Sequence, residues 1–147
     1  MTVNPKILIV DDNDLNIKLC RAILKDNYQI FTATSAEEGL ESAKRILPDL
    51  ILMDIQLPGM DGLTATRAIR SDDQLKETPV IALTSFAMVG DREKMLSAGC
   101  DEYLPKPIDI QGLRSTVARF LDAPPAARSG TQTLKKPETG RAGLALS

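Results

Sequence analysis

Three runs of four consecutive apolar residues stand out along the chain: Ile7–Val10, Leu50–Met53 and Val80–Leu83. Each run is too short for a helix and is bounded by polar or turn-forming residues, which is the pattern of a strand buried on both faces of a parallel sheet. The aromatic and β-branched segment Tyr28–Thr32 and the brief segment Glu102–Leu104 predict two further strands. The pattern therefore predicts five strands.

The segments that follow the strands predict five helices, because their apolar residues recur at the spacing of one helical face. Capping residues mark several helix ends: the Asp11–Asp14 cluster, the capping box at Ser35, Gly99 and Asp109. The expected apolar faces are Leu15, Leu19, Ala22 and Ile23; Ala36, Leu40, Ala43 and Leu47; Leu63, Ala68 and Ile69; Met95 and Leu96; and Ile110, Leu113, Val117, Phe120 and Leu121.

Alternation of strands and helices predicts a doubly wound α/β fold with a parallel sheet and right-handed crossovers. Four of the five strands end on polar groups, namely Asp11 and Asp12, Asp54, Thr84 and Lys106. The carboxyl ends of parallel strands lie at one edge of a sheet, where α/β proteins bind ligands. We therefore expect these side chains to share one crevice.

Length and composition indicate one domain, residues 1–123, followed by a flexible tail, residues 124–147, that begins Pro-Pro-Ala-Ala and has no apolar periodicity. The tail carries four basic residues and one acidic residue, so the domain holds 14 basic and 19 acidic residues and a formal charge of −5. That balance argues against a nucleic-acid partner.

No apolar run approaches the roughly 18 residues of a membrane span, and the first residues lack the features of a secretory signal, so we expect a cytoplasmic protein. The two cysteines, Cys20 and Cys100, have no metal-ligand spacing and are expected to be reduced thiols. The chain has no histidine. Its chemistry must therefore depend on carboxylates, lysine and hydroxyl groups.

Three carboxylates in one crevice repel one another, and a divalent cation would relieve that repulsion. Mg²⁺ suits an all-oxygen site better than zinc does. Lys106 adds a positive charge that can contact a phosphate, and Thr84 adds a hydroxyl donor. Beside a metal and a lysine, an ionised Asp54 is a plausible nucleophile toward phosphorus.

The chain resembles the bacterial response-regulator receiver domains over residues 6–121. The matching motifs are Asp11-Asp12 after the first strand, Leu52 to Gly62 around Asp54, Leu83-Thr84-Ser85, and Lys106-Pro107. The resemblance implies a flavodoxin-like strand order, 2-1-3-4-5. It also implies that Asp54 is the phosphoacceptor, and that Asp11, Asp12, Asp54 and the Gln56 backbone carbonyl hold Mg²⁺.

The resemblance further implies a signalling switch rather than an enzyme. Lys106 would contact the phosphoryl group, the Lys106–Pro107 bond would be cis, and Thr84 and Tyr103 would be the switch residues. A histidine kinase or a histidine phosphotransferase would supply the phosphoryl group, and a protein target would bind the face formed by the fourth helix, fifth strand and fifth helix. The chain is most similar to the single-domain type without a DNA-binding output, and we expect a monomer.

Each motif alone has a simpler interpretation. The cluster at Asp11 could be only a helix cap, Asp54 could be a turn residue, and Lys106 could be a solvated surface lysine. A site is favoured because the acids, Thr84 and Lys106 all end strands of one sheet.

Two other functions remain open. A phosphatase of the haloacid-dehalogenase type also uses a nucleophilic aspartate, but it needs a second acid two residues later, where this chain has Gln56. A phosphate-independent adaptor would not need the complete set of acids, Thr84 and Lys106.

Overall fold

The computed structural model describes residues 4–85 and 91–122. The tail predicted for residues 124–147 lies outside the described residues. Of the described residues, those up to Arg114 belong to one compact unit, and residues 115–122 belong to another. The sheet and the candidate site belong entirely to the first unit.

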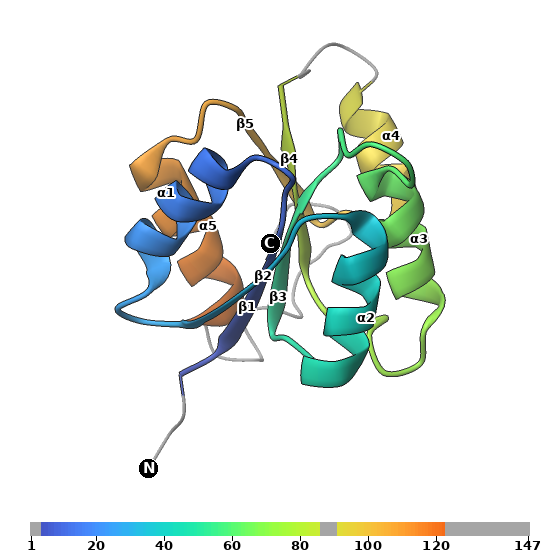
Figure 1. The fold of residues 1–147 in the computed structure, drawn as a ribbon, viewed down its shortest axis with the longest axis horizontal. Coiled ribbons are helices and arrows are strands. Elements are labelled where there is room, and N and C mark those ends of the chain that lie inside the picture. The colour runs from blue at the N-terminus through green and yellow to red at the C-terminus, as the bar shows by residue number, and fades with distance from the viewer. Residues whose placement is uncertain (1–3, 86–90, 123–147) are drawn as a thin grey trace. The chain divides into compact units, whose positions relative to one another are not determined.

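The described residues form one parallel sheet of five strands in the order β2-β1-β3-β4-β5 (Figure 1). Each strand pairs in parallel with its neighbours, so all five carboxyl ends lie at one edge. The predicted doubly wound fold and its strand order are confirmed. The strands are β1 (Lys6–Val10), β2 (Gln29–Ala33), β3 (Leu50–Asp54), β4 (Val80–Thr84) and β5 (Glu102–Pro105).

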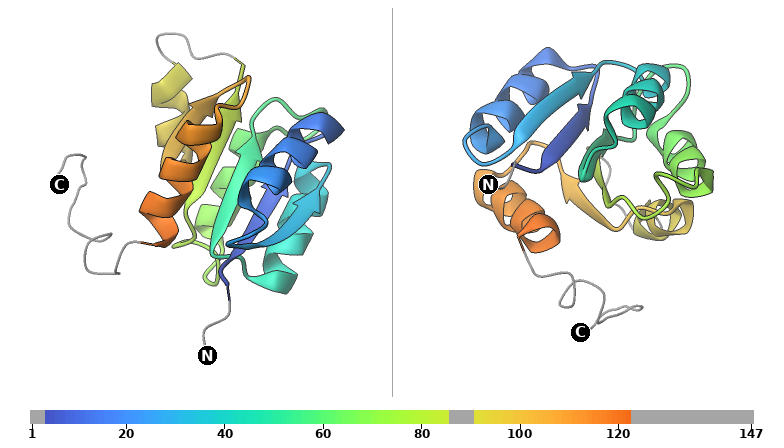
Figure 2. Two further views of the ribbon diagram at one scale, coloured as in Figure 1. Left: turned by 90° about the vertical axis from the view of Figure 1, so that its left-hand side faces the viewer. Right: turned by 90° about the horizontal axis from the view of Figure 1, so that it is seen from below.

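A helix follows each strand, as the sequence predicts. Helix α1 lies on one side of the sheet, and α2, α3 and α4 lie on the other (Figures 1 and 2). The helices are α1 (Asp14–Leu24), α2 (Ala36–Ile46), α3 (Gly62–Ser71), α4 (Asp91–Ala98) and α5 (Ile110–Leu121).

The central strands form the core. All residues of β3 and β4 are buried, as are the last four of β1. Strands covered on both faces need apolar side chains at every position, which explains the uninterrupted apolar runs. Edge strand β2 is only partly buried along most of its length, in keeping with its mixed sequence.

Side-chain caps fix several helix starts. Asn13 caps α1 by accepting from the Asn16 backbone N–H at 3.1 Å, and Ser35 caps α2 by accepting from the Glu38 N–H at 3.1 Å. Asp109 accepts from the Gly112 N–H at the start of α5. These caps confirm the predicted ones, because each satisfies an N–H group that the helix itself leaves unpaired.

Several predicted helix faces are wrong in detail. In α1 the buried stripe includes Ile17, Cys20 and Leu24, whereas Leu15 is 74% exposed. Ile23 of the predicted face is buried as expected, but the buried stripe is centred on another side of the helix than Leu15. Spacing alone did not decide which stripe the sheet would cover.

The same error recurs elsewhere. Ala22 and Leu19 are exposed in α1, and Ala68 is exposed in α3, where Ala65 and Thr66 are buried instead. Leu47 lies beyond the end of α2 in a left-handed conformation with φ of 51°. The remaining exposed members of the predicted faces are Leu96 and Ile110, in α4 and α5.

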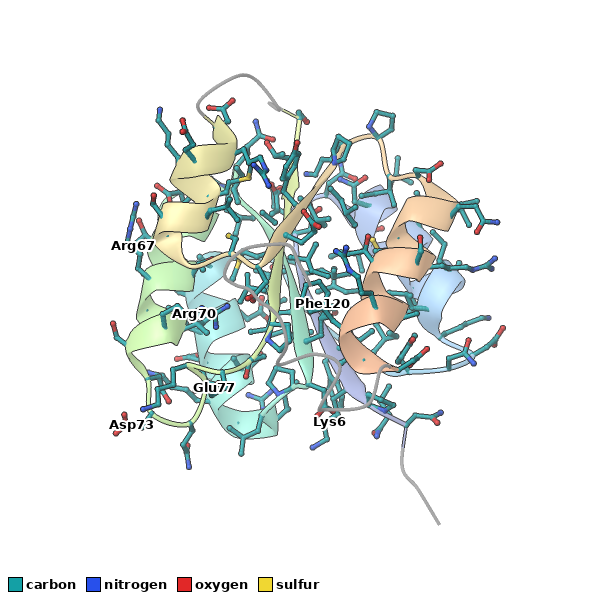
Figure 3. The ribbon with its side chains drawn as sticks, turned by 180° about the vertical axis from the view of Figure 1, so that it is seen from behind. Lys6, Arg67, Arg70, Asp73, Glu77 and Phe120 are labelled. Carbon is teal, nitrogen blue, oxygen red and sulfur yellow. The ribbon has the colours of Figure 1, made fainter. Side chains whose placement is uncertain are left out.

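Arg70 joins α3 to two connecting segments of the sheet. Its guanidinium donates to the carbonyls of Gly99 and Thr78 at 2.8 and 2.7 Å, and to the Asp101 carboxylate at 2.6 Å. Figure 3 shows Arg70 and Arg67 on the same helix, with Arg67 nearer the outer edge of the molecule. Arg70 therefore ties α3 to the segments that precede β4 and β5.

Both cysteines are buried free thiols, as expected. Burial raises the pKa of Cys20 to about 11 and that of Cys100 to about 11. Both side chains therefore stay protonated and unreactive near neutral pH. Within the described part of the chain, no helix has the length and apolar character that a bilayer crossing requires.

Candidate functional site

The ends of three strands bring the predicted site residues together. Asp11 directly follows β1, Asp54 is the last residue of β3, and Lys106 directly follows β5. In the sheet Val10 of β1 pairs with Met53 of β3. The residues that directly follow these two, Asp11 and Asp54, are therefore neighbours. Parallel pairing thus gathers groups that lie up to 95 positions apart in the sequence.

Lys106 lies between the two buried acids. Its Nζ atom is 3.1 Å from Asp54 Oδ2 and 3.5 Å from Asp11 Oδ2. The Asp11 and Asp54 side chains are 0% and 2% exposed, and that of Lys106 is 14% exposed. One ammonium group therefore faces two carboxylates, which leaves the cluster with a net negative charge.

Main-chain and side-chain donors orient the two carboxylates. Asp54 Oδ1 accepts from the Gln56 backbone N–H at 2.9 Å, and Asp11 Oδ1 accepts from the Asn13 backbone N–H at 2.8 Å. The Asn16 side chain donates to Asp11 Oδ2 at 3.3 Å. The sequence prediction did not include Asn16. The only sequence feature that could have indicated Asn16 is its position in the first turn of the helix that follows the acids.

Burial raises the pKa of Asp11, and the nearby Asp54 carboxylate raises it further, against the lowering effects of the Asn13 hydrogen bond and Lys106. A positive charge next to Asp11 would favour its ionised form. One carboxylate oxygen from each of Asp11, Asp12 and Asp54 lies within 4.8 Å of the other two, and Asp12 is exposed. An all-oxygen donor set with excess negative charge suits Mg²⁺.

The remaining predicted residues flank this cluster. Thr84 is fully buried at the end of β4, and its carbonyl accepts the Lys106 backbone N–H at 2.8 Å. Tyr103 lies in β5 opposite Ala82 and packs against the apolar core. The Lys106–Pro107 peptide bond is cis. A main-chain hydrogen bond therefore joins Thr84 to Lys106. Tyr103 lies in β5, the strand that Lys106 directly follows.

Gly62 allows α3 to begin directly beside the site. A Cβ atom at this position would overlap the carbonyl oxygen of Asp54 and lie 2.6 Å from the Cα of Ile55. Both neighbours are backbone atoms, so neither can move without displacing the end of β3. The small residue at the start of α3 is therefore needed for close packing next to Asp54.

We expect Gly62→Ala to lower the free energy of unfolding by about 1–3 kcal/mol, the usual cost of overpacking. Urea denaturation would measure the loss. Gly112→Ala is the comparison, because an added Cβ there would approach only the Asp109 side chain, at 3.0 Å. A loss at Gly62 no larger than that at Gly112 would contradict the packing argument.

Comparison with known proteins identifies the class. The response regulator receiver domain model matches residues 7–118, and the chain belongs to that family. It is a receiver domain of two-component signalling.

Two relatives within the family are response regulators. The chain is 42% identical over 116 residues to the polar-differentiation response regulator DivK of Brucella anthropi, covering 78% of this chain and 94% of that protein. The solved structure of the chemotaxis response regulator CheY4 of Vibrio cholerae has a TM-score of 0.77 and 29% identity, covering 81% of this chain and all of that one.

A third relative contains a metal ion. It is the receiver domain of the sensor histidine kinase PA1611 from Pseudomonas aeruginosa, solved with a magnesium ion coordinated in its active-site cleft. The match has a TM-score of 0.76 and 37% identity, and covers 82% of this chain and all of that one. Receiver domains therefore include both free regulators and parts of kinases.

Proposed function

We propose that this protein is a phosphorylation-controlled switch that accepts a phosphoryl group on Asp54 from the phosphohistidine of a histidine kinase or a histidine phosphotransferase. The observation that carries the proposal is the buried Asp54 carboxylate with Lys106 Nζ at 3.1 Å. In the reaction an Asp54 oxygen forms a bond to phosphorus as the bond from phosphorus to the donor's imidazole nitrogen breaks. The imidazole nitrogen keeps the electron pair of that bond.

We assign the metal site to Asp11, Asp12, Asp54 and the backbone carbonyl of Gln56. Bound Mg²⁺ would offset the negative charge on the phosphoryl oxygens. Lys106 offers a second positive charge to the same oxygens, and the hydrogen bond from the Gln56 N–H to Asp54 Oδ1 orients the carboxylate. The fit of the three carboxylates to a divalent cation supports this assignment.

The proposed switch residues are Thr84 and Tyr103, and Pro107 belongs to the same connection after β5. The proposed target surface consists of α4, β5 and α5. This choice rests on the resemblance to receiver domains.

The protein would act as a cytoplasmic monomer with no catalysis beyond slow loss of its own phosphoryl group. A haloacid-dehalogenase type of phosphatase is disfavoured, because the side chain two residues after Asp54 is the amide of Gln56, which accepts a hydrogen bond from the Ser85 backbone N–H. That position holds no general acid. No feature of the described site favours an adaptor whose binding is independent of phosphorylation.

Incubation with acetyl phosphate and Mg²⁺ tests the proposal. We expect intact-protein mass spectrometry to show one added phosphoryl group, lost again at alkaline pH as an acyl phosphate is, and no addition when EDTA removes the metal. Sustained hydrolysis of small phosphate esters would indicate the phosphatase instead. A protein that gains no phosphoryl group from acetyl phosphate or from a phosphorylated histidine phosphotransferase would contradict the proposal.

A further inference from the structure

The side chain of Gln56 bridges two segments at the edge of the site. Its Oε1 atom accepts a hydrogen bond from the Ser85 backbone N–H at 2.9 Å. Gln56 is two residues after Asp54 at the end of β3, and Ser85 directly follows Thr84 at the end of β4. A side chain from the segment after β3 thus accepts a hydrogen bond from a main-chain donor directly after β4.

Gln56 also contacts the phosphoacceptor through its backbone, since its N–H donates to Asp54 Oδ1 at 2.9 Å. The neighbouring Ile55 N–H donates to the Leu83 carbonyl at 3.2 Å and continues the pairing of β3 with β4. The Ser85 N–H is therefore held at the same sheet edge as the Asp54 carboxylate. One residue connects the site of modification to the start of the β4–α4 connection.

We propose that Gln56 acts as a latch, in which its side-chain oxygen holds the Ser85 N–H in the unmodified protein and releases it when Asp54 is phosphorylated. This inference rests on the proposed function. A phosphoryl group would bring anionic oxygens to an edge where the Ser85 donor is occupied by a neutral amide oxygen. Hydrogen bonds to anions are roughly twice as strong as those between neutral groups, so the amide oxygen is the weaker competitor.

The latch sets the balance between the two states. Because the bond to Ser85 exists only in the unmodified state, it stabilises that state and opposes phosphorylation. Loss of the Gln56 acceptor should shift the equilibrium toward the modified state. Gln56 is in this respect a positioning residue, acting through Ser85 and the segment after Thr84 rather than on phosphorus.

The variant Gln56→Met tests the latch, because it keeps the side-chain length and removes the acceptor. Beryllofluoride, a stable mimic of the phosphoryl group on aspartate, is titrated at saturating Mg²⁺, after the Mg²⁺ affinity of each protein has been measured separately. We expect Gln56→Met to bind beryllofluoride about two- to fivefold more tightly than the wild type, as loss of one solvent-exposed neutral hydrogen bond implies. Gln74→Met, an exposed substitution away from the site, is the control and should match the wild type.

A second readout is the Ser85 amide itself, followed by hydrogen exchange and by its resonance. In the wild type without beryllofluoride, the Ser85 amide should exchange its hydrogen more slowly than in Gln56→Met, and beryllofluoride should shift the Ser85 amide resonance in the wild type. Equal beryllofluoride affinity in the wild type and Gln56→Met, or equal exchange at Ser85, would overturn the latch while leaving the proposed function intact. Failure of the wild type to bind beryllofluoride at all would overturn both.

Discussion

Replacing Asp54 by Asn is expected to abolish phosphoryl transfer to the protein. The amide of Asn has no anionic oxygen to attack phosphorus, and the proposal places the phosphoryl group on Asp54 and not on Asp11 or Asp12. Labelling with radioactive phosphate from a phosphorylated histidine phosphotransferase would measure the loss. We expect no signal above background for Asp54→Asn under conditions that label the wild type to completion.

The fold should survive this substitution. Asn has nearly the volume of Asp, and its side-chain oxygen can still accept from the Gln56 N–H that now donates to Asp54 Oδ1. Removing one of the clustered negative charges also relieves repulsion at Asp11. We therefore expect unfolding of metal-free Asp54→Asn at no lower urea concentration than the wild type. Residual labelling by a folded variant would show that another residue accepts the phosphoryl group.

Replacing Arg70 by Met is expected to lower the stability of the fold substantially, although the side chain is partly exposed. The change removes donors to the carbonyls of Gly99 and Thr78 and to the carboxylate of Asp101. Within the described part of the chain, the Asp101 carboxylate then keeps the hydrogen bond from the Val80 N–H. Hydrogen bonds to charged groups contribute about 1.5–3 kcal/mol each when buried.

Partial exposure reduces that figure, because the Arg70 and Asp101 side chains are 23% and 40% exposed and water screens their attraction. We expect Arg70→Met to lower the free energy of unfolding by about 2–3 kcal/mol in urea denaturation. Arg67→Met is the matched control on the same helix (Figure 3), at an exposed position, and should change stability by less than about 0.5 kcal/mol. Similar effects at the two positions would contradict the role given to Arg70.

The sequence was most informative for the central strands, because a strand buried on both faces needs apolar side chains at nearly every position. Strands β1, β3 and β4 followed from their apolar runs, and the parallel topology then required that the acids and Lys106 meet at one edge. Convergence of the charged residues could therefore be predicted before any distance was known. It depends only on which residue ends each strand.

Helix faces were less predictable, because two overlapping stripes of a helix can have the same spacing. In α1 the stripe with Ile17 and Cys20 faces inward, while Leu15 of the predicted stripe points to solvent. Only the position of the sheet decides between such stripes. A local pattern does not contain that information.

Contacts between side chains and distant backbone groups could not be predicted at all. Arg70 binds the carbonyl of Gly99, 29 residues away, and Gln56 binds the N–H of Ser85, also 29 residues away. Backbone groups carry no sequence signal of their own, so such partners emerge only from the folded arrangement. The Gln56 contact lies beside Asp54, whereas the Arg70 contact lies just before β5, at the opposite edge of the sheet.

The most direct test of the account locates the phosphoryl group. Protein phosphorylated by a histidine phosphotransferase is treated with borohydride, which reduces an aspartyl phosphate to homoserine, and is then digested and sequenced by mass spectrometry. The account predicts homoserine at position 54 alone, in a reaction that requires Mg²⁺. Homoserine at position 11 or 12, or at no position in a protein that has been labelled, would contradict it.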